Sequence, residues 1–145
     1  MDPYSIILYC LDNFSNVDPV DSHDGTTIYF DRGEGKRSFF INIKEFDTPD
    51  DNSSNLDRDG IFRITIRLSK KSYDDLFGTQ ANNKYVQSKG CDYKQVNKIM
   101  PHKTLSKEYY IICLSPSNDL FNSILKYLIA DGYRESRRLY LSGGQ

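Results

Sequence analysis

The sequence predicts an α+β protein in which a curved antiparallel sheet of about four or five strands is packed by three helices in a two-layer sandwich. Runs of β-branched and aromatic residues separated by short turn segments favour antiparallel strands. Apolar residues at helical spacing mark one helix at the start of the chain and a longer one near its end. With 145 residues, 38% of them hydrophobic, the chain can bury a sizeable single core.

A helix and a β-hairpin are predicted at the start of the chain. Asp2-Pro3 suits a helix start, because Asp caps backbone N–H groups and Pro is favoured at the first helical position. Apolar residues recur at helical spacing from there, and the helix is expected to end near residues 15–16. The segments TTIYFD (26–31) and SFFINI (38–43) flank the turn-type sequence RGEGKR, which predicts the hairpin.

A further strand and a short helix are predicted after a polar loop over residues 47–60. Apolar and polar side chains alternate over residues 61–68, which predicts a half-buried strand with Arg63 and Arg67 on a basic outer face. Residues 69–78 predict the short helix, capped by a serine and closed by a glycine.

The last third of the chain predicts one strand and one long helix. Residues 79–90 are polar and are expected to be mobile, and residues 93–100 predict one or two helical turns. The apolar run YYIICL (109–114) predicts a central strand. The final helix starts at residues 117–118, carries an apolar stripe, and either ends at Gly132 or continues to Arg138.

The closing pentapeptide LSGGQ (141–145) matches the signature of ABC-transporter ATPases, but nucleotide chemistry is not expected. That signature opens a helix that faces a phosphate, and no residue follows Gln145. A Walker A loop is also missing, since the nearest string, GEGKR (33–37), lacks Ser or Thr after its lysine. We therefore predict a single domain over residues 1–140 and a flexible Gly-rich tail over 141–145.

Composition favours a cytoplasmic protein without a membrane segment or a cofactor. A net charge of −1 and a pI near 6.1 give no drive toward nucleic acid or anionic membranes. The chain has no apolar run of ~18 residues and no secretory signal at its start. The two His and three Cys never come within metal-ligand spacing. The odd number of widely spaced cysteines, including Cys10, indicates free thiols in a reducing compartment.

Two stretches of the chain, NLDRDGIFRITIRLSKKSYDDLFG (55–78) and MPHKTLSKEYYIICLSPSNDLFNSILKYLIADGYRES (100–136), resemble a family of small bacterial proteins catalogued as domain of unknown function 6194. Asp59 and Lys103 depart from the family pattern, which has Pro at both positions. The order of elements also looks like the MmcQ/YjbR-type fold. These resemblances imply an uncharacterised bacterial protein and supply no reaction. The matching residues are Leu56, Asp57, Arg58, Gly60, Phe62, Arg63, Pro101, His102 and Pro116.

The candidate binding residues are Asp57, Arg58, Arg63 and His102. If the strands that they flank are neighbours, these side chains gather at one end of the sheet. The structural alternative is that Asp57 forms a salt bridge with Arg58 or Arg63 and clamps the long loop, while His102 pins its own loop by donating a hydrogen bond.

Three function classes follow from these residues. The favoured one is a non-enzymatic module, monomeric or homodimeric, that binds a small molecule or a protein. A small hydrolase or transferase with His102 as general base is the alternative. A weak nucleic-acid-binding module is the second alternative, although nucleic acid is the less expected partner. It would use Arg63, Arg67 and the arginines at 134, 137 and 138.

Overall fold

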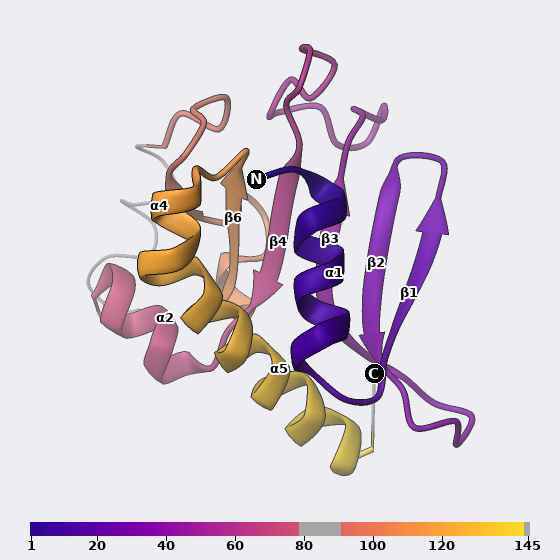
Figure 1. Cartoon of the computed structure of the whole chain (residues 1–145). Coiled ribbons are helices and arrows are strands. Elements are labelled where there is room, and N and C mark those ends of the chain that lie inside the picture. The colour runs from indigo at the N-terminus through magenta and orange to yellow at the C-terminus, as the bar shows by residue number, and fades with distance from the viewer. Residues whose placement is uncertain (79–90, 144–145) are drawn as a thin grey trace.

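The computed structural model describes residues 1–78 and 91–143, so the predicted mobile segment 79–90 lies outside the described residues. It confirms the α+β class, with an open antiparallel sheet of six strands instead of four or five. The helices lie together on one face of this sheet (Figure 1). The elements are α1 (Pro3–Asn13), β1 (Val17–Ser22), β2 (Gly25–Phe30), β3 (Ser38–Lys44), β4 (Arg63–Arg67), α2 (Lys70–Phe77), β5 (Ile99–Pro101), η1 (Ser106–Glu108), β6 (Tyr110–Leu114), α4 (Asn118–Leu120), η2 (Phe121–Leu125) and α5 (Lys126–Leu141).

The strands follow the order β1-β2-β3-β4-β6-β5, and every neighbouring pair is antiparallel. The first four strands form a meander, whereas the short β5 occupies the edge beyond β6. Every residue of β6 is buried, because strands flank it on both sides and both of its faces are covered. The predicted strand over 109–114 is thus confirmed, one position in from the sheet edge.

The helical layer is formed chiefly by α1 and α5, which cross the sheet side by side (Figure 1). Asp2 caps α1 as predicted, since its Oδ1 accepts a hydrogen bond from Ser5 N–H at 2.8 Å. The last helical segment passes through a π-helical turn, η2, and continues through Gly132 to Leu141. Gly132 does not end the helix. It permits close packing on the sheet, where a Cβ atom would lie 2.5 Å from Ile66 Cγ2.

Two strands were missed by the sequence prediction. β1 reads VDPVDS and is exposed along almost its whole length, so it shows no alternation of apolar and polar residues. It is an edge strand, the position in which a proline such as Pro19 is tolerated. Residues 99–101 form β5 where helical turns were predicted, because Met100 pairs with Ile112 of the neighbouring strand.

The outer face of the sheet was predicted to be solvent-facing and basic at β4, and this prediction is wrong. The loop over residues 47–60 folds across that face, and Arg63 is only 5% exposed. A second, smaller apolar cluster forms there, away from the main core between sheet and helices. Its buried members are Leu56, Tyr93, Met100, Ile112 and Leu114.

Candidate functional site

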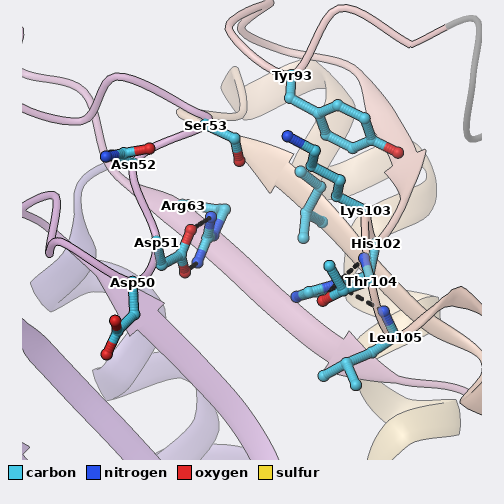
Figure 2. A pocket seen from close by; sticks show the side chains of 11 residues that line it. Asp50, Asp51, Asn52, Ser53, Arg63, Tyr93, His102, Lys103, Thr104 and Leu105 are labelled. Atoms are coloured by element: carbon cyan, nitrogen blue, oxygen red, sulfur yellow. Dashed lines mark hydrogen bonds and ion pairs between the residues drawn. The ribbon is translucent and has the colours of Figure 1, made fainter.

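A pocket of about 370 Å³ lies on the outer face of the sheet, between the 50–53 part of the long loop and the 102–105 segment that follows β5. Figure 2 shows Arg63 and Asp51 on one side of this pocket and His102 on the other. Strand β4 positions Arg63, and the end of β5 positions His102. Two of the predicted candidate residues therefore face one cavity.

The acidic partner of Arg63 is Asp51. Both terminal nitrogens of Arg63 donate to the Asp51 carboxylate, with Nη1 at 3.0 Å from Oδ1 and Nη2 bonded to Oδ2. Lys44 Nζ lies 3.5 Å from the same carboxylate and 3.3 Å from Asp24 Oδ2. The hydrogen bonds from Arg63 are the largest cause that lowers the pKa of Asp51 to about 2. Because two carboxylates meet two cations, the charges of this network cancel.

His102 is held in one tautomer by its own loop. Its Nδ1 accepts hydrogen bonds from the backbone N–H groups of Thr104 at 3.1 Å and Leu105 at 3.0 Å. A backbone N–H can only donate, so Nδ1 carries no proton and the proton of the neutral ring is on Nε2. His102 was predicted to pin its loop by donating a hydrogen bond. The loop is pinned, but the direction was wrong, because the ring nitrogen is the acceptor.

The pKa of His102 is lowered to about 4, so the ring is neutral at pH 7. Burial is the main cause, because it penalises the charged imidazolium. The positive charge of Arg63 acts in the same direction, and the negative charge of Asp51 opposes it. His102 thus presents a neutral N–H donor at Nε2.

Asp57 and Arg58, the other two candidates, line a different cavity at the far end of the loop. Arg58 donates to three backbone carbonyls, those of Asn55 at 2.8 Å, Ser54 at 3.0 Å and Lys94 at 2.9 Å. Asp57 Oδ1 accepts a hydrogen bond from the backbone N–H of Asp47 at 3.2 Å. Among the ion pairs of residues 1–78 and 91–143, none joins Asp57 to Arg58 or Arg63, so that predicted salt bridge is wrong, and the carboxylate that pairs with Arg63 is Asp51.

Sequence reasoning missed Asp51 and Lys44. The loop over 47–60 contains five aspartates, and nothing in their spacing distinguishes the one that reaches β4. Lys44 was placed just beyond a predicted strand, yet it is the last residue of β3 and is buried. Lys44 and Arg63 are direct partners across β3 and β4, and this pairing brings both cations to the carboxylate of Asp51.

The described residues contain neither a cluster of side chains suited to a metal ion nor a helix suited to a membrane span. Within residues 1–78 and 91–143, no group of three or more His, Cys, Asp or Glu side chains could hold a metal ion. Among the helices of the same segments, none is long and apolar enough to cross a membrane.

An open antiparallel sheet of six strands, packed on one face by a layer of helices, defines the class of this chain as a two-layer α+β fold. The chain belongs to the family of unknown function DUF6194, whose family model matches residues 1–141. No curated protein and no solved structure matches it. The family resemblance is confirmed, whereas the MmcQ/YjbR-type fold and the bacterial source stay predictions.

Proposed function

We propose that this protein is a binding module that holds a small polar molecule in the pocket between Arg63 and His102. The observation that carries the proposal is the fixed tautomer of His102. Two backbone N–H groups occupy Nδ1, so Nε2–H is a preorganised donor at the wall of a cavity. A carbonyl, hydroxyl or similar acceptor of a ligand would satisfy it.

The charges around the pocket favour a ligand without net charge, either neutral or zwitterionic. The lining contains two acidic side chains, Asp50 and Asp51, and two basic ones, Arg63 and Lys103. Leu105 and Ile112 add apolar surface to the lining. A neutral molecule with one acceptor group and a short apolar part fits this combination.

The state of His102 favours binding over catalysis. A general base needs a free lone pair near the reacting proton. In His102 the lone pair of Nδ1 receives two backbone N–H groups, and Nε2 already carries the proton. A low pKa further weakens the ring as a proton acceptor at pH 7. The hydrolase or transferase alternative is therefore the weaker one.

The charge partners of the arginines also weigh against the nucleic-acid alternative. Arg63 is buried and its terminal nitrogens are paired with Asp51, so its guanidinium is not exposed to a phosphate backbone. On α5, Arg134 lies 3.7 Å from Asp131 Oδ1, and Arg138 donates to Glu135. These residues belong to the opposite face of the molecule and do not extend the pocket.

Two substitutions at His102 test the proposal as a matched pair. In His102→Asn, the amide oxygen replaces Nδ1 as acceptor for the Thr104 N–H, as in an Asx turn, but the Nε2 donor is lost. In His102→Gln, the amide nitrogen reaches the position of Nε2, while the loop loses its acceptor. Native mass spectrometry would be run with panels of free amino acids, sugars and nucleosides.

A bound mass that survives in His102→Gln and disappears in His102→Asn is the expected result. Equal binding by His102→Asn and the unmodified protein would show that Nε2–H holds no ligand. The absence of any bound mass, both with these panels and with protein taken from its own cell extract, would contradict small-molecule binding altogether.

A further inference from the structure

A groove of about 560 Å³ lies at the other end of the long loop and is separate from the His102 pocket. Its walls are the start of α1, residues 45–46 just after β3, and residues 56–62. The last of these segments contains the LDRDGIF stretch, on which much of the family resemblance rests. The proposed small-molecule site makes no use of this stretch.

The floor of the groove is apolar, and its rim carries an exposed aromatic ring. Leu56 and Phe62 are almost fully buried and line the base. Phe46 is 56% exposed, and Ile61 is partly exposed beside it. An aromatic side chain left this open at a cavity offers a large contact area to a partner.

Four carboxylates surround this apolar floor, namely those of Asp2, Glu45, Asp57 and Asp59. All four residues are exposed, and within residues 1–78 and 91–143 none of them forms an ion pair. The one basic side chain in the lining, Arg58, gives its donors to backbone carbonyls. The Met1 ammonium also lines the groove and donates to Asn118, but four carboxylates outnumber these two cations, so the rim is net negative.

We propose that this groove is the docking site for a protein segment in which an apolar side chain is flanked by lysine or arginine. The apolar side chain lies against Phe46 and Ile61, and the flanking cations lie near Glu45 and Asp59. Complementary charge at an exposed rim sets specificity and association rate and is screened by salt, whereas the buried apolar contact supplies most of the affinity. This surface is independent of the His102 pocket.

Titration of the ¹⁵N-labelled full chain with short peptides, followed by NMR, tests this inference. The probe is the capped peptide Lys-Lys-Leu-Phe-Lys-Lys. One comparison peptide replaces the lysines by glutamates, and another replaces Leu-Phe by Ser-Ser. The expected result is a shift of the amide signals of residues 45–46 and 56–62 with the first peptide alone. Raising the salt concentration from ~0.05 to ~0.3 M should weaken the binding of this peptide.

Substitutions on the rim give the decisive comparison, because they replace exposed side chains and leave the core intact. Phe46→Ser, and Glu45→Lys combined with Asp59→Lys, should each weaken peptide binding about tenfold. The controls are Tyr127→Ser, at a ring 63% exposed on α5, and Asp12→Lys, at an exposed acid of α1. Both controls should bind as the unmodified protein does, and so should His102→Asn.

Three outcomes would overturn the inference. One is the absence of any amide shift at peptide concentrations of about 1 mM. Another is a set of shifted amides that lies outside the groove. The third is equal weakening by the rim and control substitutions, which would mean that only the overall charge of the protein matters.

Discussion

Lowering the pH from 7 to 4 should destabilise the protein through His102. Its pKa in the folded state is about 4, below the ordinary value of 6.5. Between these two values the unfolded chain binds a proton at this residue and the folded chain does not. The stabilising contribution is therefore complete above pH 6.5 and is lost as the pH falls toward 4. Protonation of the folded ring would also break the hydrogen bonds that Nδ1 accepts from Thr104 and Leu105.

The size of the effect follows from the difference between the two pKa values. One pKa unit corresponds to about 1.4 kcal/mol, so the fall from 6.5 to about 4 corresponds to roughly 3 kcal/mol in the free energy of unfolding. In a chain of this length, that is a change of roughly 6–12 °C in the unfolding temperature.

Urea unfolding of the unmodified protein and of His102→Asn, measured at pH 7, 5.5 and 4.5, isolates this contribution. Carboxylates titrate in both proteins, so the difference between the two unfolding curves reports on His102 alone. The variant should lose less stability on acidification. His23 lies exposed in the turn between β1 and β2, so His23→Asn should follow the unmodified protein. Parallel pH dependence in His102→Asn and the unmodified protein would refute the reasoning.

Two further substitutions test the clamp and the helix packing. Asp51→Asn leaves the buried Arg63 without its carboxylate and should lower the free energy of unfolding by about 2 kcal/mol, discounted for the partial exposure of Asp51. In urea unfolding, the exposed Asp50→Asn should change it by less than about 0.5 kcal/mol. Gly132→Ala would stabilise an ordinary helix by about 1 kcal/mol, but its Cβ would lie 2.5 Å from Ile66 Cγ2. Gly132→Ala should therefore lower the free energy of unfolding by about 1–3 kcal/mol, seen as a lower unfolding temperature. A higher unfolding temperature would contradict the close approach of Gly132 to Ile66.

Local signals in the sequence predicted most of the helices and the better-patterned strands. Helix α2 begins after Ser69 and ends before Gly78, as predicted, because capping chemistry depends on neighbouring residues alone. Strand β1 carries no such signal, since its extended conformation depends on pairing Val17 with Phe30 and the residues that follow. The three residues of β5 depend in the same way on β6.

The candidate site was predictable in its residue types but not in its partners. Arg63 and His102 stand out in sequence because each adjoins a patterned strand. The identity of the carboxylate opposite Arg63, and the tautomer of His102, depend on how the loops fold back over the sheet. Asp51, Arg63 and Lys44 come from three separate segments of the chain. Their contacts therefore produce no periodic pattern in the sequence.

The long loop is closed at two places, and this separates the two proposed sites. Near its middle, Asp51 joins Arg63 and Lys44 beside the His102 pocket. Near its ends, the Asp47 carboxylate accepts the Leu56 N–H at 2.9 Å, while the Asp47 N–H donates to Asp57 beside the groove. Because the second closure uses none of the atoms of the first, Asp51→Asn should impair the pocket and leave peptide binding unchanged. Weaker binding at both sites in Asp51→Asn would contradict this separation and would mean that the loop moves as one unit.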